Sequence, residues 1–324
     1  MGTTVKATLA FFIVAGSIVT AGPAAAQNYP TKPIRLIVSF APGGQGDILA
    51  RTIGPKVAGT FKQSVLVDNR PGAGGTIAYE ITVRANPDGY TMILAASGYA
   101  TSAALYKLTY DPMNDVAPIA LIGESGFVVA LHPSIPVTSI KELIAHDKAN
   151  PGKLNYGSSG IGGATHLATE LFNQMTGSRM THVPYKGMIL ALNDLIGEQI
   201  QVIFGNLSNV IPQAKSNRVR VIAMTTAKRS SALPDIPTVA ETVPGYEAAL
   251  WYAVLGPKGL PKDIVARWNS EINRVLQLPD VKERMAGDGL EPVGGSPERF
   301  REVLSRDIAK WQKVVKIAGI KVGS

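Results

Sequence analysis

Hydrophobic and polar positions repeat one arrangement along most of the chain: an apolar run, a glycine-rich loop, and then apolar positions spaced as on one face of a helix. The first instance starts with the apolar run IRLIVSF (34–40), which predicts a buried strand. A helix should then open near Asp47, and Gly54-Pro55 should kink it or cut it short. Its apolar stripe consists of Leu49, Ile53 and Val57.

The arrangement recurs further along the chain and predicts an α/β protein. Further strands are expected at 64–69, 91–97, 154–158, 200–206 and 250–257. Helices are expected at 76–85, 138–150, 164–177, 261–277 and 296–318. Thr138 or Ser139 is placed to cap the second of these helices, and Ser296 the last. Strands that alternate with helices are typical of a parallel sheet covered on both faces.

The alternation pauses around 118–133, where two apolar runs follow each other, and then restarts. A connection with several prolines, 230–246, leads the chain back to a further strand and two helices. We therefore expect two hinged lobes that share two or more crossings: residues 27–125 plus 227–324 form lobe 1, and 126–226 form lobe 2. Each lobe should be a mostly parallel sheet flanked by helices.

The first residues have the composition of a secretory signal peptide. Lys6 precedes the apolar stretch 9–19, and small residues stand at Ala24 and Ala26. Cleavage after Ala26 would remove residues 1–26 and leave an exported, periplasmic chain. A membrane anchor is the weaker alternative, because a span needs about 20 apolar residues.

Charge and cysteine content narrow the possible partners. The chain has a net charge of +8, but its basic residues are scattered, and the densest cluster (214–229) contains no aromatic residue. A nucleic-acid interface is therefore not expected, whereas a mild positive field would concentrate anionic small molecules. The sequence contains no cysteine, so no disulfide is available in an oxidising compartment.

Two glycine-rich loops, 41–47 and 157–166, each join a predicted strand to a predicted helix. Glycine lets the backbone take positive φ and approach a ligand closely, and Asp47 is placed to cap the first helix. Free N–H groups at the positive end of a helix favour an anion. The second loop adds three hydroxyl groups, those of Ser158, Ser159 and Thr165. If the lobes face each other, both loops close on one cleft; the alternative is that each loop is only a tight turn.

Other chemistry is not indicated by the motifs. Neither loop has the lysine of a Walker loop or the spacing G-x-G-x-x-G, and 157–161 lacks the last glycine of a nucleophile elbow. The four histidines lack metal-ligand spacing, so we expect no catalytic residue, no metal and no cofactor. Residues that follow other predicted strands are weaker candidates for the lining of the cleft: Ser97, Tyr99, Thr101, Tyr185 and Asn206.

Several segments together resemble the extracytoplasmic solute-binding receptors of tripartite tricarboxylate transporters, the Bug family. The match runs from about Tyr29 to Lys321 and is carried by YPTKPIRLIVSFAPGGQGDILAR, DNRPGAGG, NPDGYT, YDPMNDVAPIA, ANPGKLNYGSSGIGGATHLATELF, HVPYKG and LPDIPTVAE. The resemblance implies a two-lobed Venus-flytrap fold of the type II periplasmic-binding-protein kind. It also implies capture of a small carboxylate by main-chain groups and bridging waters.

The resemblance points to ligand-binding residues in both glycine loops. In the first lobe these are Phe40, Ala41, Gly43 and Gly44, next to the capping residue Asp47. In the second lobe they are Ser158, Gly160, Gly162, Gly163 and Thr165, with Ser159 between the first two. The chain departs from the family at Met188, Ile189 and Leu190, and it lacks an acidic residue in the strand 200–206. Both departures favour an aromatic or simple aliphatic carboxylate over an amino acid.

The resulting prediction is a monomeric periplasmic carboxylate-binding protein that is not an enzyme. Its partner is either the membrane permease of a tripartite tricarboxylate transporter or a sensor protein, and the sequence does not separate these. An exported enzyme would need Ser158 or His166 to act chemically. A purely structural or interaction protein would have no cleft.

Overall fold

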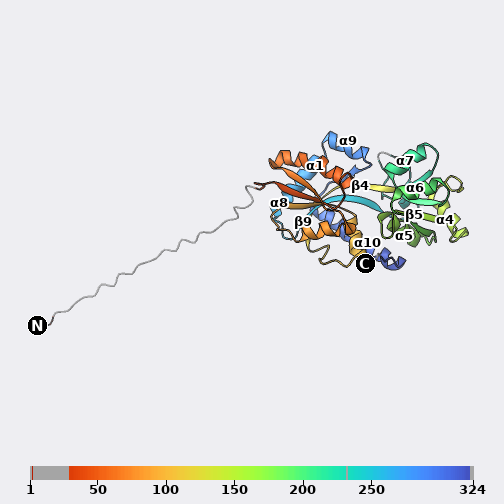
Figure 1. Ribbon diagram of the computed structural model, residues 1–324, viewed down its shortest axis with the longest axis horizontal. Coiled ribbons are helices and arrows are strands. Elements are labelled where there is room, and N and C mark those ends of the chain that lie inside the picture. Colours follow the sequence, from red (N-terminus) through yellow and green to blue (C-terminus); the bar gives the residue numbers. More distant parts are fainter. Residues whose placement is uncertain (1, 3–28, 231–232, 322–324) are drawn as a thin grey trace.

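The computed structural model describes residues 2, 29–230 and 233–321 of the chain. The predicted signal peptide lies outside the described residues, apart from Gly2, so its cleavage stays a prediction. Figure 1 shows two lobes side by side, with long strands running between them.

The first lobe is built on the strands β1 (Ile34–Val38), β2 (Val65–Asn69), β3 (Thr91–Ala96), β9 (Ala249–Pro257) and β10 (Glu291–Pro292). Its helical elements are α1 (Gln45–Phe61), η1 (Ala73–Gly75), α2 (Thr76–Val83), α3 (Gly98–Leu105), α8 (Lys262–Val275), α9 (Pro279–Gly287) and the start of α10 (Pro297–Ala318). Strand β1 pairs in parallel with β2 and β3, whereas β9 is antiparallel to β3. Four of the five residues of β1 are buried, because helices cover both faces of this sheet.

The second lobe contains β5 (Asn155–Ser158), β6 (Thr181–Pro184), β7 (Val202–Asn206) and β8 (Arg220–Met224). Its helices are α4 (Ile140–Ala149), α5 (Ala164–Thr176), α6 (Met188–Ile196) and α7 (Leu207–Lys215), and the short helix η2 (Val239–Glu241) lies in the connection back. Strand β5 pairs in parallel with β6 and β7. Each lobe thus has three parallel strands, completed by antiparallel strands where the chain crosses between lobes.

Strand β4 (Val116–Leu131) carries the chain from one sheet to the other. Residues 116–126 pair with β9 in the first sheet, and residues 127–131 pair with β7 in the second. The two apolar runs predicted at 118–133 are therefore one continuous strand of 16 residues, buried along most of its length. The exact lobe boundaries at 126 and 226 stay predictions.

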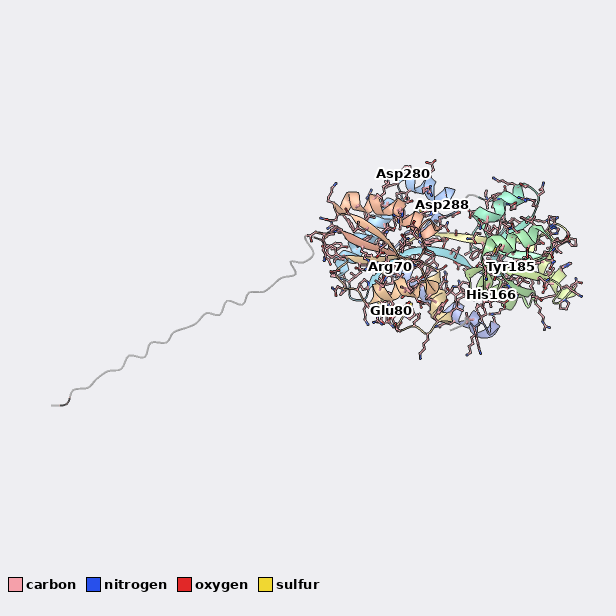
Figure 2. All side chains as sticks on the ribbon, viewed as in Figure 1. Arg70, Glu80, His166, Tyr185, Asp280 and Asp288 are labelled. Carbon is pink, nitrogen blue, oxygen red and sulfur yellow. The ribbon has the colours of Figure 1, made fainter. Side chains whose placement is uncertain are left out.

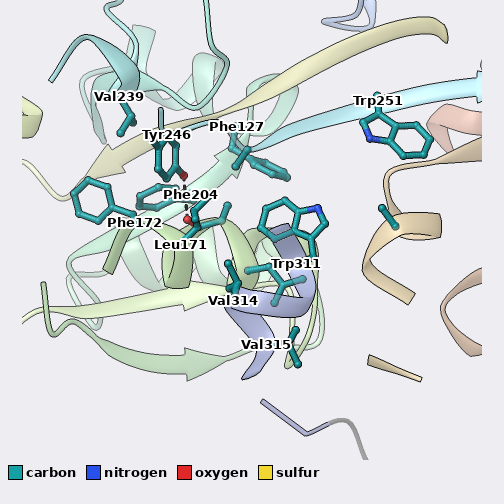
Figure 3. Packing of buried hydrophobic residues seen from close by; sticks show 14 of the residues in the cluster. Phe127, Leu171, Phe172, Phe204, Val239, Tyr246, Trp251, Trp311, Val314 and Val315 are labelled. Atoms are coloured by element: carbon teal, nitrogen blue, oxygen red, sulfur yellow. Dashed lines mark hydrogen bonds between the residues drawn. The ribbon is translucent and has the colours of Figure 1, made fainter. Parts of the chain in front are cut away.

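Helix α10 is a further connection between the lobes. It has 22 residues and is about 33 Å long, and its last turns leave the first lobe. Trp311, Val314 and Val315 belong to the same buried cluster as Phe172 and Phe204 of the second lobe (Figure 3). The side-chain amide of Gln174 on α5 donates to the carbonyl of Val314 over 3.0 Å. Residues 227–324 were expected in lobe 1, but this helix packs against both lobes, because its apolar stripe continues to its end.

The helix starts differ in part from the predictions. Ser139 and Ser296 cap α4 and α10, as expected, by accepting from the backbone N–H three residues on. Helix α1 is not cut short by Gly54-Pro55, because its buried stripe runs on to Phe61. Asp47 is not its cap: the helix begins two residues earlier, and Gly44 occupies the capping position.

Candidate functional site

A cavity of about 460 Å³ lies between the lobes and is lined by both. From the first lobe it is lined by Ser39, Phe40, Gly72, Gly74, Gly75, Tyr79, Ala96, Ser97, Gly98, Thr101, Ser102, Leu105, Tyr106, Leu250 and Tyr252. From the second lobe it is lined by Ile161, Gly162, Gly163 and Ala164. Residues on both sides of the predicted cleft therefore share one hollow.

None of the described residues that line this cavity carries a charge. Its polar groups are backbone N–H and C=O groups and the hydroxyls of serine, threonine and tyrosine. Three helices start at its wall: α2 after Gly75, α3 after Ser97 and α5 after Gly163. Because the N-terminus of a helix carries partial positive charge, the wall attracts an anion without any basic side chain.

Free backbone donors are present on both walls of the cavity. Within the described part of the chain, the N–H groups of Phe40 and Gly98 in the first lobe make no hydrogen bond. The same holds for Ile161 and Ala164 in the second lobe. An N–H group without a partner at the wall of a cavity is available to a ligand, so these four groups are the natural donors to a carboxylate.

Asp47 organises the first glycine loop instead of facing the cavity. Its buried carboxylate accepts from the N–H of Gly43 over 2.9 Å, from the side chain of Asn69 over 2.9 Å, and from Arg51 over 3.0 Å. The bond from Gly43 and the Arg51 guanidinium lower the pKa of Asp47 to about 2. The carboxylate predicted to cap the helix therefore fixes the preceding loop.

The loop RPGAGG (70–75), which was not among the predicted ligand-binding residues, contributes three of the lining glycines. Gly75 has φ +92° and lies against Tyr79, so that a Cβ atom there would be 2.6 Å from the tyrosine hydroxyl. No other residue type fits this position. The run of glycines after a strand beside β1 is the signal that could have identified this wall.

The second glycine loop is fixed by bonds among its own residues and two histidines. The N–H of Ser159 donates to Thr165 over 3.0 Å, and the N–H of Gly160 donates to the hydroxyl of Ser158 over 3.1 Å. Gly162 donates to Nδ1 of His166 over 3.0 Å. Most N–H groups of this loop are therefore satisfied internally.

The structure brings some of the predicted residues to the cavity and places others elsewhere. Phe40, Ser97, Thr101, Gly162 and Gly163 line the cavity. The others are not in its lining: Ala41, Gly43, Gly44, Asp47, Tyr99, Ser158, Ser159, Gly160, Thr165, Tyr185 and Asn206.

The two tyrosine candidates, Tyr99 and Tyr185, have hydrogen-bond partners outside the cavity lining. Tyr99 is buried and donates to the carbonyl of Pro112 over 2.9 Å. Tyr185 donates to Asp194 over 2.7 Å, and burial together with this contact raises the pKa of Tyr185 to about 12. Figure 2 shows Tyr185 and His166 in the second lobe and Arg70 in the first.

Ser158 and His182 form a contact that resembles part of a catalytic site. The Ser158 hydroxyl lies 2.7 Å from Nε2 of His182. The serine side chain is completely buried and does not line the cavity, so the contact supports the loop instead of presenting a nucleophile. Among the described residues, no three His, Asp or Glu side chains are placed to share a metal ion.

A larger cavity of about 690 Å³ is lined by the crossing strands and α10, not by the glycine loops. Two of its basic side chains are paired within the cavity: Arg306 with Glu247 at 3.3 Å, and Lys310 with Asp307 at 2.9 Å. Trp251 also donates to Asp307 over 2.8 Å. Because the glycine loops of both lobes line the smaller, uncharged cavity and not this one, the smaller cavity is the candidate ligand site.

The chain is similar to proteins of one family over nearly its whole length. Residues 49–320 match the tripartite tricarboxylate transporter family receptor, TctC. The protein BugT of Bordetella pertussis is 34% identical over 324 residues, which cover 99% of each chain. Among the described residues, no helix has the length and apolar character to cross a bilayer.

Two solved structures of similar proteins contain carboxylates. R. palustris Rpa4515 with adipate is 38% identical, with a TM-score of 0.73, over 90% of this chain and 99% of that chain. MatC from Rhodopseudomonas palustris with bound malate is 29% identical, with a TM-score of 0.70, over 89% of this chain and 100% of that chain. The chain has the two-lobed periplasmic-binding-protein fold and belongs to the TctC/Bug family of periplasmic solute-binding receptors.

Proposed function

We propose that this protein captures a small carboxylate in the cavity between its lobes and delivers it to the membrane permease of a tripartite tricarboxylate transporter. The observation that carries the proposal is the uncharged cavity lined by both lobes, with free N–H groups on each wall. Family membership supports the same class of ligand, since similar proteins are known with adipate and with malate.

The geometry suggests how the ligand is held. Phe40 and Gly98 offer N–H groups from the first lobe, and Ile161 and Ala164 offer them from the second. A carboxylate bound to both pairs would link the lobes, and this link favours a closed arrangement about the hinge. Among the residues predicted from the sequence, Phe40, Ser97, Gly162 and Gly163 belong to this site, whereas Asp47, Ser158 and Thr165 support it.

The lining also bears on selectivity. Leu105, Ile161 and Leu250 add apolar surface, and no acidic side chain of the described lining is available for an ammonium group. An amino acid would leave its charged nitrogen buried without a partner, which costs several kcal/mol. We therefore assign the site to carboxylates with an apolar body, either aliphatic or aromatic.

Calorimetric titration of the mature protein, residues 27–324, tests the capture step. Adipate and malate serve as probes, and the matched controls are hexane-1,6-diol, which lacks the charges, and 1,6-diaminohexane, which reverses them. A carboxylate should bind and the controls should not. At a hundred times its Kd, the ligand should raise the free energy of unfolding by about 2.7 kcal/mol. Equal binding of adipate and the diol, or no response to any mono-, di- or tricarboxylate, would contradict the proposal.

Export and delivery need separate measurements. Mass spectrometry of the secreted protein should find an N-terminus at Gln27, as predicted from the small residues before it. Uptake of a labelled ligand by cells should stop when this gene is deleted and return when it is restored. Retained uptake, together with loss of a transcriptional response to the same ligand, would instead indicate a sensor partner.

A further inference from the structure

Two histidines are stacked beneath the second glycine loop. The ring centroids of His166 on α5 and His182 on β6 are 3.8 Å apart, and their planes differ by 10°. Tyr156 on β5 continues the stack, with its centroid 4.9 Å from that of His182. His166 is buried and His182 is half-buried. Neither ring lines the cavity.

Both rings contact the loop that forms the second wall of the site. Nδ1 of His166 accepts the N–H of Gly162 over 3.0 Å, so this nitrogen carries no proton. Nε2 of His182 lies 2.7 Å from the Ser158 hydroxyl, and that hydroxyl accepts the N–H of Gly160. The loop is therefore attached to the stack at its beginning and near its end.

These attachments decide which donors remain for a ligand. The N–H groups of Gly160 and Gly162 are directed to Ser158 and His166, whereas those of Ile161 and Ala164 stay free within the described residues. Gly162 has φ +74°, a conformation that the bond to His166 helps to maintain. Without that bond, the Gly162 N–H would compete for the ligand or for water, and its neighbours would lose their orientation.

We propose that His166 and His182 are positioning residues of the ligand site: as neutral, stacked rings they fix loop 158–163 so that Ile161 and Ala164 present their N–H groups to the ligand. This inference rests on the proposed function, since it concerns the same site. His166 acts through Gly162, and His182 acts through Ser158 and through its stacking on His166.

The surroundings keep the pair neutral. Burial, and for His166 also the neighbouring His182, lower the pKa of each ring to about 4. The Tyr156 hydroxyl, at the end of the stack, donates to Glu170 over 2.5 Å. This carboxylate is occupied by Tyr156, so it does not hold a proton on the histidines. A proton on Nδ1 of His166 would remove the acceptor of the Gly162 N–H.

The test compares two substitutions of His166 with the wild-type protein. His166→Asn keeps an acceptor near the position of Nδ1 and does not titrate, whereas His166→Leu removes the acceptor. At pH 7, His166→Leu should bind adipate about tenfold more weakly, the effect of one lost hydrogen bond, and His166→Asn should stay within about threefold. His146→Asn, on the unrelated helix α4, is the control and should bind as the wild type does. Equal affinity of His166→Leu and wild type would overturn the inference.

A second readout needs no ligand, so it separates this inference from the proposed function. In ¹H–¹⁵N NMR spectra, the Gly162 amide of the wild-type protein should be protected from exchange, and its resonance should titrate with a midpoint near that of the His166 ring. In His166→Asn the protection should be retained and the titration should disappear, whereas in His166→Leu the protection should be lost. If His166→Leu does not fold, the wild-type titration decides. A Gly162 resonance that ignores the protonation of His166 overturns the inference, whatever the protein binds.

Discussion

The two walls of the cleft both offer free backbone N–H groups, but different chemistry fixes their shape. The first glycine loop is attached to the buried carboxylate of Asp47, which is bonded to Gly43, Asn69 and Arg51. The second loop is attached to neutral imidazoles, which contact Gly162 and Ser158. One wall therefore depends on a charge that must be kept, and the other on two groups that must stay uncharged.

Because a carboxylate supports one wall and imidazoles support the other, the two walls should lose their support in different pH ranges. The folded-state pKa of Asp47 is lowered from 3.8 to about 2, so its contribution is complete above about pH 4 and is lost between these values. The pKa values of His166 and His182 are lowered from 6.5 to about 4, so the folded state loses stability as the pH falls through that range. The second wall is the first to be affected by acid.

The largest effect on stability should come from Asp47→Ala. The substitution leaves the N–H of Gly43 and one of the two N–H groups of the Asn69 side chain without an acceptor, and it also unpairs Arg51. We expect the free energy of unfolding at pH 7 to fall by about 3 kcal/mol, because two hydrogen-bond donors lose their charged acceptor. Urea denaturation measures it.

Arg51→Ala is the matched control for that change. The Arg51 side chain is 55% exposed, so its removal leaves the carboxylate with its two other donors. The loss should be about 1 kcal/mol or less. A loss as large as that of Asp47→Ala would mean that the ion pair, and not the loop contacts, stabilises the first wall.

A charge placed on the second wall should have the next largest effect, and it acts on binding. Ile161 lines the cavity and is 54% exposed, so Ile161→Asp should fold normally. Its carboxylate would repel an anionic ligand, and we expect adipate affinity to fall about 100-fold, or about 2.7 kcal/mol. Ile317→Asp, at a site that is 59% exposed and outside the cavity, should leave affinity unchanged. If both substitutions change adipate affinity equally, the ligand does not bind at this wall.

A smaller effect is expected in the pH dependence of stability, which should show that the second wall, and not the first, loses its support between pH 6.5 and 4. Between pH 6.5 and 4 the unfolded chain takes up protons on histidines that stay neutral in the folded state, so the free energy of unfolding falls as the pH is lowered. For one histidine, a pKa lowered from 6.5 to about 4 corresponds to about 3 kcal/mol in the free energy of unfolding. Local rearrangement of the folded protein around the protonated ring makes the measured value smaller. We expect the wild type to lose about 2 kcal/mol more than His166→Asn, measured by urea denaturation at both pH values. If the free energy of unfolding falls equally in the two proteins, His166 is not the origin of the pH dependence.

Much of this architecture follows from the sequence, because local patterns determine it. The apolar runs of β1, β3 and β9 predict buried strands, and the capping serines of α4 and α10 are correct. The helix α3 was missed, since GYATSAAL has no charged residue and a weak periodic pattern. Its start nevertheless supplies Ser97 and Gly98 to the cavity, which shows that a short helix at a strand end can be overlooked as a loop.

The site was only partly predictable, for a different reason. Glycine loops and hydroxyls identify segments that can approach a ligand, but not which N–H groups are already used within the segment. Ser158, Ser159 and Thr165 read as ligand contacts, whereas in the fold they bond to the loop and to His182. The histidine stack itself joins residues 16 positions apart on α5 and β6, and such contacts depend on how helix and sheet pack.

The smallest of the expected effects tests whether the first wall binds through its backbone alone. Tyr252 lines the cavity, its ring lies 6.0 Å from that of Phe40, and its hydroxyl donates to the side chain of Gln45 over 3.0 Å. Tyr252→Phe keeps the ring and removes one hydrogen bond, so it should cost about 1 kcal/mol of stability and change adipate affinity by less than about threefold.

Tyr246→Phe is the matched control for Tyr252→Phe, because its hydroxyl also makes one hydrogen bond, to the carbonyl of Ala168 over 3.0 Å, and it does not line the cavity. Thermal denaturation should give similar losses of stability for both substitutions. If Tyr252→Phe instead weakens binding more than tenfold while Tyr246→Phe does not, the Tyr252 hydroxyl donates to the ligand. The first wall would then use a side-chain donor that the second wall lacks, and the two walls would differ in how they bind as well as in how they are supported.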